Sequence, residues 1–569
     1  MKPSVCAVLV ALAGACASSG SGSGARIAGG PVFPTAQELT TIATRPATPP
    51  RFDPTRQVDR WQLGEPLPAI LGATAHDTGS AAGRLLATRY LTNTKVVLTG
   101  GMECVAREYG RFWLAHQAMP TPELQTFIQA RCGAPVARVG VVLQGGPEPG
   151  GATLAGRWQT EAQALLAKLP DVPHAALGMW SGEADGRSVV AAAVGVRMVE
   201  LEPLGLDAGA GGEIELRGRF LDATGLAAAF VTRGAHGFQI CKPVPGTALP
   251  RFRFVCKVDA NDEAVLVELM ASPPGRLLTQ RALVGLFAPG KSAPGEYGAA
   301  TLALAATPMP QRDAAAMLAA INGVRARAGV APLREVAAQS AVAARVLPHY
   351  FGASSSGDIK TAETVALGMM AGWEVKGDAA IRSGEFAAMN LFGVASMDRA
   401  VEAVLMTPAH RSVLLDPTAE AIALATQDYA DGAATSAIVT TYKFYRGADN
   451  ERESAKILDR LDAERAAAGQ APVIRVQGGN SAKPMAHACR RIKSGVDPNE
   501  ALHDVLEYLV EEVGISMQGL VLQGSDLDTI AFPAELIQAR RVQIDVDVDH
   551  YQPEGRAWGQ YVVLMVFAG

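Results

Sequence analysis

The chain has 569 residues, enough for three or four domains at roughly 150 residues each. Hydrophobic residues make up 49% and charged residues 19%, a composition typical of packed globular domains and not of long disordered chains. The 51 Lys and Arg against 56 Asp and Glu leave a net charge of −5, which argues against nucleic acid as the main ligand.

The first 15 residues have the pattern of an export signal. A basic start is followed by an apolar run over residues 5–15, too short for a bilayer span of about 20 residues. Residues 12–16 (LAGAC) resemble the lipobox of bacterial lipoproteins, which implies cleavage before Cys16 and acylation of its thiol. An ordinary secretory cleavage is the alternative. Ala17 stands where an inner-membrane retention signal has Asp, so we expect a lipid anchor in the outer membrane.

Residues 16–80 are rich in Gly, Ser, Pro and Thr, and we expect a flexible tether and linker there. Two helices are predicted next, over residues 102–118 and from Pro122, with Thr121 as the N-cap of the second. If the helices fold back on each other, Cys104 and Cys132 lie opposite and form a disulfide bond.

Short alternating strands predict a β-sandwich between residues 201 and 308. Cys241 and Cys256 are symmetric about a turn, so a hairpin would place them opposite each other as a second disulfide. Both bonds require an oxidising compartment. Cys489 is left over, and we expect it to be a buried free thiol and not a reactive one.

A repeated pattern predicts three related α/β modules. In each module a glycine ends a helix, at Gly133, Gly372 or Gly514. A second glycine follows 12 residues later in the first and middle modules and 10 residues later in the last. The predicted organisation is a signal peptide (1–15), a tether and linker (16–80), the first module (81–200), the β-sandwich (201–308), the middle module (309–447) and the last module (448–569).

Three segments of the middle module carry a family resemblance. They are residues 320–333 (AINGVRARAGVAPL), 383–386 (SGEF) and 407–417 (TPAHRSVLLDP). In order and spacing they resemble the first helix, the Gly-Glu-Asn element and the Ser-Pro-Gly-His-Arg segment of the CAP superfamily (cysteine-rich secretory, or SCP-type, proteins). The resemblance covers about residues 311–446 and implies an α-β-α sandwich. Residues 451–473 weakly repeat the first helix, so the last module is predicted to be a diverged copy. The fold class predicted is α/β, with CAP-like α-β-α sandwich modules, one recognisable and two diverged, and an inserted all-β sandwich domain.

The candidate site lies in this middle module. His410 is predicted at the third position of a helix that Thr407 caps, where the helix dipole favours a neutral imidazole able to bind a metal or accept a proton. Glu385 is expected near the start of a helix, and His349 at the end of an Ala-rich helix. The CAP resemblance implies that His349, Glu385 and His410 share a cleft and can hold a divalent cation such as Zn²⁺. The alternative is that they form hydrogen bonds that only fix the fold.

A second acidic cluster lies near the C-terminus. Alternation places Asp545, Asp547 and Asp549, next to His550, on one face of a strand. We expect a solvated strand face, with a Ca²⁺ site as the alternative.

Three functions remain open at this point. The leading prediction is a non-enzymatic, lipid-anchored protein of the bacterial cell envelope, periplasmic or surface-exposed, that binds a small apolar ligand, a glycan or another envelope protein. The first alternative is a metal-assisted hydrolase that uses His349, Glu385 and His410. The second is an architectural or adhesive surface protein.

Overall fold

The computed structural model describes most of the chain. The described residues are 33–48, 50, 55–72, 96–147, 160, 164, 174–244, 246–259, 262–274, 276, 279–298, 312–376, 379–392, 396–429, 434–445, 450–476, 479–514, 517–524, 527, 530–553 and 556–568. The predicted signal peptide and Cys16 lie outside these residues. In the part that the structure describes, no helix is long and apolar enough to cross a membrane.

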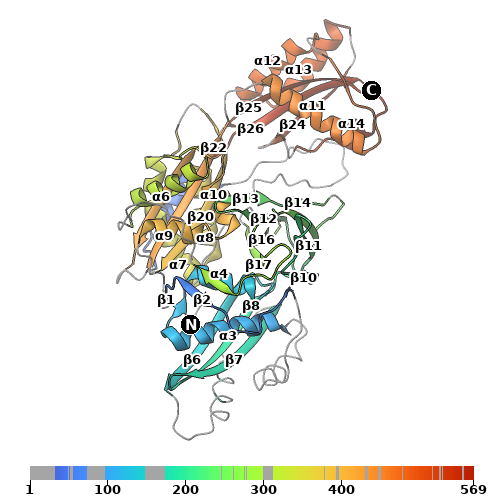
Figure 1. The fold of residues 1–569 in the computed structure, drawn as a ribbon. Coiled ribbons are helices and arrows are strands. Elements are labelled where there is room, and N and C mark those ends of the chain that lie inside the picture. The colour runs from blue at the N-terminus through green and yellow to red at the C-terminus, as the bar shows by residue number, and fades with distance from the viewer. Residues whose placement is uncertain are drawn as a thin grey trace.

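Three four-stranded sheets, which lie in different parts of the molecule (Figure 1), have the same strand order. In the first module the strands, in spatial order, are β4 (Val96–Leu98), β7 (Ala175–Ala184), β8 (Arg187–Val196) and β6 (Arg138–Pro147). In the middle module they are β19 (Arg334–Glu335), β21 (Ala421–Asp428), β22 (Ala434–Phe444) and β20 (Ile381–Phe392). In the last module they are β23 (Ile474–Arg475), β25 (Gln543–Tyr551), β26 (Gln560–Ala568) and β24 (Gln518–Gly524). In each sheet the first strand along the chain is parallel to the third, which forms an antiparallel hairpin with the fourth. The second strand lies at the edge, antiparallel to the fourth. One topology is therefore formed three times.

Helices cover both faces of the middle and last sheets. On the middle sheet, one face is covered by α6 (Ala314–Arg327), α9 (Met397–Val404) and α10 (Pro408–Leu414), and the other by α7 (Ala337–Ser356) and α8 (Ile359–Ala371). On the last sheet, one face is covered by α11 (Asn450–Ala467) and α14 (Ala534–Gln538), and the other by α12 (Ala482–Lys493) and α13 (Pro498–Glu511). Successive side chains of a strand point to opposite faces, so Phe386 joins the core under α7 and α8 while Ala387 joins the core under α6 and α9. The chain is thus a mixed α/β protein.

A buried arginine stabilises the middle and last modules in the same way. Arg325 of α6 and Arg465 of α11 are both 0% exposed. Arg325 donates hydrogen bonds to the carbonyl oxygens of Ala331, Leu414, Asp416 and Ala419, and Arg465 donates to those of Ala471, Leu536, Ile537 and Ala539, at 2.6–3.3 Å. Each arginine therefore ties the first helix of its module to the segment before the third strand, and satisfies carbonyl groups that burial would otherwise leave unpaired.

The glycines that revealed the repeat are not equivalent in position. Gly145 pairs with Val189 near the start of β8 and Gly524 with Tyr561 near the start of β26, whereas Gly384 pairs with Tyr442 near the end of β22. The alignment of the middle module with the other two on these glycines was therefore wrong, because strand register is set by which face each side chain buries and not by the distance from the preceding helix.

Two antiparallel sheets share one core between the first and middle modules. One contains β9 (Val199–Leu201), β11 (Glu213–Phe220), β14 (Lys242–Pro243) and β15 (Arg251–Lys257), and the other contains β12 (Leu226–Arg233), β13 (Gly237–Ile240), β16 (Val265–Ser272) and β17 (Gln280–Phe287). Ile214 and Phe254 of the first sheet and Val231 and Leu269 of the second are buried in that core. The alternating pattern of these strands gives each sheet one apolar face, and the two apolar faces meet.

Both predicted disulfide bonds are confirmed. Cys104 of α3 (Gly100–His116) is bonded to Cys132, which directly follows α4 (Pro122–Arg131), and Cys241 is bonded to Cys256. Thr121 is the N-cap of α4, as expected. Cys489 is free and buried, which is also as predicted.

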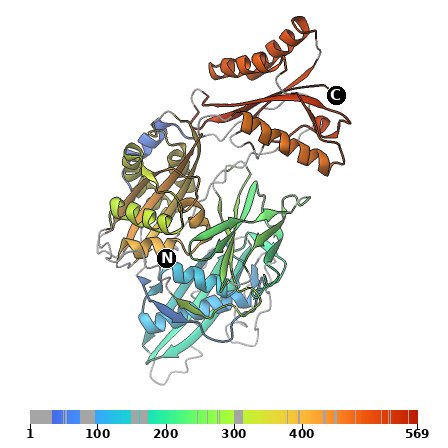
Figure 2. The ribbon, with the colours of Figure 1, turned by 45° about the horizontal axis from the view of Figure 1, so that its top comes forward.

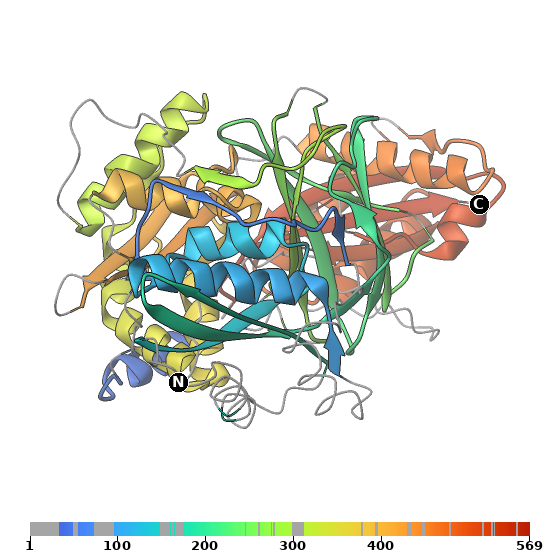
Figure 3. The same ribbon diagram turned by 60° about the horizontal axis from the view of Figure 1, so that its bottom comes forward.

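Part of the predicted tether and linker is ordered structure. Within residues 33–72 the chain forms α1 (Ala36–Ala43) and the short strands β1 (Thr55–Arg56), β2 (Arg60–Gln62) and β3 (Ile70–Leu71), which pair with β5 (Met119–Pro120), β18 (Glu296–Gly298) and β10 (Leu204–Gly205) respectively. Figure 3 shows the part of this segment with β1, β2 and β3 running along α3 and α4. The expectation of a flexible linker up to residue 80 was wrong here, because these strands pair only with partners that are distant in sequence.

The last module is held to the middle module by the hairpin that joins β25 and β26. Trp558 in this connection donates from its indole to the carbonyl oxygen of Met370 at 2.9 Å, and its ring lies 4.6 Å from that of Phe33. The backbone N–H of Gly559 donates to Ile381 of β20. Figure 2 shows the last module beyond the middle module, at the opposite end of the molecule from the first module.

Candidate functional site

Glu385 is part of a partly buried ion-pair cluster. It lies in strand β20, and not near the start of a helix as predicted. Its Oε1 is 2.5 Å from Nζ of Lys443, and the same ammonium group is 2.6 Å from Oδ2 of Asp416. Burial raises the pKa of Glu385 against the opposing effect of Lys443. Burial acts to lower the pKa of Lys443, but the two carboxylates outweigh it and raise that pKa. Lys443 therefore occupies the place between two carboxylates where a bound cation would lie.

His410 is buried and neutral. It is the third residue of α10, with Thr407 as N-cap and Pro408 at the first position, as the sequence predicted. Its Nδ1 is 2.7 Å from Oγ1 of Thr407. Burial, with a smaller effect of Arg281, lowers the pKa of His410 to about 3. The imidazole is neutral at pH 7 mainly because it is enclosed.

The β-sandwich encloses the helix that carries His410. Glu268 of β16 is 0% exposed and accepts a hydrogen bond from the backbone N–H of Ala409 at 3.0 Å. Arg281 of β17 pairs with the same carboxylate at 2.5 Å. Arg411 donates to the carbonyl oxygens of Gly234, which follows β12, and Gly237, the first residue of β13. A carboxylate at a helix N-terminus is favourable, so this contact fixes α10 against the β-sandwich.

His349 lies on the opposite face of the middle sheet. It is within α7, whose buried side chains join the core that contains Phe386 and Ala388. Its side chain forms a hydrogen bond with the backbone of Ala43, the last residue of α1, and burial lowers its pKa. His349 therefore contacts the N-terminal segment of the chain.

The structure does not bring His349, Glu385 and His410 into one cleft. The sheet separates His349 from His410, and Glu385 is bound to Lys443. Among the residues that the structure describes, no group of three His, Cys, Asp or Glu side chains is placed to hold a metal ion. The shared metal-binding cleft implied by the CAP resemblance is therefore not formed by these three residues.

The acidic residues of β25 face a helix and not solvent. Ser481 donates to Asp545 at 2.5 Å, and Nζ of Lys493 is 2.6 Å from Oδ1 of Asp549. Asp547 forms a side-chain hydrogen bond with Cys489, and burial raises its pKa. The prediction of a solvated strand face was wrong because α12 packs over it. Each acid has its own partner, so the cluster is explained without the Ca²⁺ alternative.

The neighbouring His550 belongs to the junction between the middle and last modules. Its ring stacks on that of Tyr445 with centroids 4.9 Å apart, and Tyr561 contacts Tyr445 edge-on at 5.0 Å. Burial lowers the pKa of His550, with Asp549 opposing this effect. His550 therefore acts in packing between modules.

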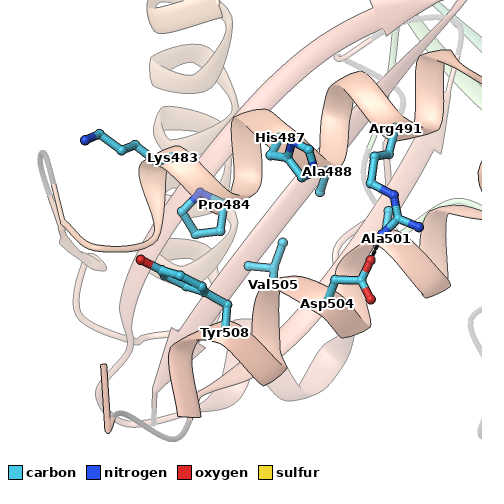
Figure 4. A pocket seen from close by; sticks show the side chains of 9 residues that line it. All are labelled: Lys483, Pro484, His487, Ala488, Arg491, Ala501, Asp504, Val505 and Tyr508. Atoms are coloured by element: carbon cyan, nitrogen blue, oxygen red, sulfur yellow. Dashed lines mark ion pairs between the residues drawn. The ribbon is translucent and has the colours of Figure 1, made fainter. Parts of the chain in front are cut away.

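A groove of about 300 Å³ lies between α12 and α13 (Figure 4). Its lining residues are Lys483, Pro484, His487, Ala488, Arg491, Ala501, Asp504, Val505 and Tyr508. Ala488, Ala501 and Val505 are at most 2% exposed and form an apolar floor, whereas Tyr508 at the rim is 45% exposed. A mostly apolar concavity with a few polar groups at its edge is typical of a binding site.

Charge is divided between the two helices that form the groove. α12 has four lysines and arginines and no acidic residue, whereas α13 has four acidic residues and no lysine or arginine. Arg491 crosses the groove to form ion pairs with Asp504 and, at 3.1 Å, with Glu500. Lys483 and Arg490 of α12 have no ion-pair partner within the described part of the chain. The groove therefore lies between a basic ridge and an acidic ridge.

Sequence reasoning missed this groove, Lys443 and the two buried arginines. A signal for the arginines was present, because Asn322 and Arg325 share their spacing with Asp462 and Arg465, and each pair is followed by Ala-Pro. No such signal exists for Lys443, since its contacts with Glu385 and Asp416 join segments that are distant in sequence. The groove lies between two consecutive helices, α12 and α13, but its concavity depends on how they pack. Comparison with known proteins found no family model and no curated protein that match this chain.

Proposed function

We propose that this chain is a non-enzymatic, lipid-anchored protein of the bacterial cell envelope that binds another envelope protein. The lipobox-like segment ending at Cys16 supports the anchor, and the two disulfide bonds fit an oxidising compartment. The middle module is proposed to be of CAP type and the last module a diverged copy. The repeated strand order and the matched arginines Arg325 and Arg465 support that relationship.

The observation that carries a binding role over catalysis is the pairing of the candidate chemical groups. Lys443 neutralises Glu385, and the β-sandwich encloses His410, so neither side chain is free to exchange a proton with a substrate. General acid–base catalysis needs a titratable group within hydrogen-bond reach of the substrate. The groove between α12 and α13, by contrast, is open and presents an apolar floor with charged rims.

The anchor is tested by fractionating cells that produce the wild-type chain or the variant Cys16→Ser. We expect the wild-type protein to sediment with membranes and the variant to be released, because its single attachment is lost. Cys489→Ser is the matched control, since this thiol is buried inside the last module. Membrane association that survives Cys16→Ser would contradict the lipid anchor.

The binding role is tested by chemical cross-linking of intact cells, followed by purification of the full chain. We expect a defined complex with a second envelope protein. Recovery of the monomer alone would contradict the proposal. Turnover of an envelope substrate by the chain, at a rate that Lys443→Met leaves unchanged, would also contradict it.

A further inference from the structure

In the first module, another part of the chain covers the helix pair that follows the first strand. Residues 61–68 lie against α3 and α4, and the ring of Trp61 is 5.0 Å from that of Phe112 in α3. Arg131 of α4 donates to the carbonyl oxygen of Pro68 at 2.6 Å. Side chains of β17 complete this core. The outer surface of this helix pair is therefore an internal interface.

In the middle module, helix α1 covers the corresponding pair. Leu39 and Ile42, three residues apart, are 3% and 6% exposed and pack on α7 and α8. Leu39 lies against Gly368, where a Cβ atom would be 2.4 Å from the leucine side chain. The sequence builds α1 locally: Thr35 and Glu38 form reciprocal N-terminal capping bonds. A short amphipathic helix therefore fits the outside of this helix pair.

The last module has the corresponding helix pair, and no described element packs on it as α1 packs on α7 and α8. The two helices can be aligned by adding 140 to the residue numbers of α8. The buried Val365 and Met369 of α8 then correspond to the buried Val505 and Leu509 of α13, and Gly368 corresponds to Tyr508. Tyr508, which lines the groove, therefore takes the place of the glycine on which Leu39 packs, so a helix docked on α12 and α13 would lie against the Tyr508 ring and not against a glycine. In the described part of the chain, the main contacts of α12 and α13 are with each other and with β24, β25 and β26.

We propose that the outer surface of α12 and α13 docks an amphipathic helix of a partner protein, as α1 docks on α7 and α8. The helix presents two apolar side chains three residues apart to the groove. It carries acidic residues on the edge that faces Lys483 and Arg490 of α12, and basic residues on the edge that faces Glu507 and Glu511 of α13. This inference rests on the proposed function and specifies the partner that the chain binds.

A second copy of this chain fits the surface less well. Helices of 12 and 14 residues are about 18 and 21 Å long. Two such faces in contact would bury roughly 800 Å² in total, below the roughly 1,200 Å² of a stable interface. A single helix that lies in the groove fills the concavity, and the chain already uses that arrangement at α1.

The test uses the full chain and three synthetic helical peptides of 16 residues, with binding followed by fluorescence anisotropy. All three have the same apolar stripe. The first has Glu on one edge and Lys on the other, the second has Glu on both edges, and the third has Lys on both. We expect the first to bind at least about fivefold more tightly than either other peptide at low salt, because each single-sign peptide places like charges together. This difference should shrink at 1 M salt.

Two variants of α13 locate the site. Tyr508→Glu places a charge in the groove and should weaken binding of the first peptide at least about tenfold. Val510→Glu is the matched control: Val510 is 52% exposed on the same helix but does not line the groove, so binding should stay within about twofold. Circular dichroism checks that both variants fold.

Several outcomes would overturn the inference. They are no binding of the first peptide up to about 1 mM, equal binding of all three peptides, or equal loss in Tyr508→Glu and Val510→Glu. Self-association of the free chain that Tyr508→Glu abolishes would identify a second copy as the occupant. If cross-linking in cells yields a partner while the peptides fail to bind, only this inference falls and the proposed function stands.

Discussion

At the scale of single residues, burial and pairing decide what each candidate group can do. Lys443 is the clearest case, because one ammonium group lies within 2.6 Å of both Glu385 and Asp416 and makes the candidate acid Glu385 an ion-pair partner. His410 is the second case, since its enclosure lowers the pKa well below the ordinary value. These residue types are common in active sites, but here each one is paired or enclosed by the residues around it.

The buried state of His410 predicts a pH dependence of stability. The unfolded chain takes up a proton on this residue below its ordinary pKa of 6.5, whereas the folded chain does so only near pH 3. Between these values the free energy of unfolding should fall as pH falls, by about 1.4 kcal/mol per pH unit from this residue. In His410→Asn the slope should be shallower, by about half that amount between pH 7 and 6 and by nearly the full amount between pH 6 and 5, measured by urea unfolding at pH 7, 6 and 5.

The control for this experiment is His487→Asn, which changes an exposed histidine of α12. Its slope should match that of the wild-type chain. A slope in His410→Asn equal to that of the wild type would show that His410 titrates normally in the folded protein.

At the scale of elements, the same arrangement is formed by dissimilar sequences. In the middle and last modules a long first helix, a two-residue strand and a helix pair precede the edge strand, and a short helix precedes the final hairpin. Arg325 and Arg465 show why this arrangement holds together, since each binds carbonyl oxygens at the point where the chain enters the third strand. The interaction is specific because a guanidinium group offers five donors in a fixed geometry.

Removal of one of these arginines should destabilise its module. Arg465→Met keeps the apolar part of the side chain but leaves four carbonyl groups without their donor, so we expect a loss of roughly 2–4 kcal/mol in the free energy of unfolding. Hydrogen–deuterium exchange of β25 and β26 should become faster. Arg490→Met, on the exposed face of α12, is the control and should change stability by less than about 0.5 kcal/mol. Equal protection of β25 in both variants would refute the role assigned to Arg465.

At the scale of the whole molecule, the modules are joined by shared cores. Helix α10 is fixed by Glu268 of the β-sandwich, and Trp558 of the last module enters the core of the middle module beside Phe33. Figure 1 shows α12 and α13 at the end of the molecule that these contacts leave free. The chain thus presents one helix pair outward from a body that is fixed elsewhere.

Loss of Trp558 should loosen the attachment of the last module. The side chain is 6% exposed, so Trp558→Ala removes a large buried contact worth about 3–5 kcal/mol as well as the hydrogen bond to Met370. We expect a larger radius of gyration in small-angle X-ray scattering. Val510→Ala, an exposed position of the same module, should leave it unchanged. An unaltered radius in Trp558→Ala would mean that other contacts, such as the stack of His550 on Tyr445, suffice to hold the module.

Local patterns in the sequence determined the features that depend on neighbouring residues. Thr121 and Thr407 were recognised as N-caps, and the disulfide partners followed from symmetry about a turn, because caps and hairpins are formed by residues close in sequence. The mixed α/β class followed from the helical and alternating patterns, because hydrophobic periodicity reports which face of each element is buried.

The tertiary structure alone decided the surroundings of the candidate site. Three questions depend on pairing between strands and on which helix covers which face of a sheet. They are whether Glu385 contacts a metal or Lys443, whether the acidic residues of β25 face water or α12, and whether His349 and His410 share a cleft. Such contacts join segments separated by tens to hundreds of residues, and no local preference encodes them. The same is true of the uncovered pair α12 and α13, since its exposure is recognised only by comparison with the covered pairs of the other two modules.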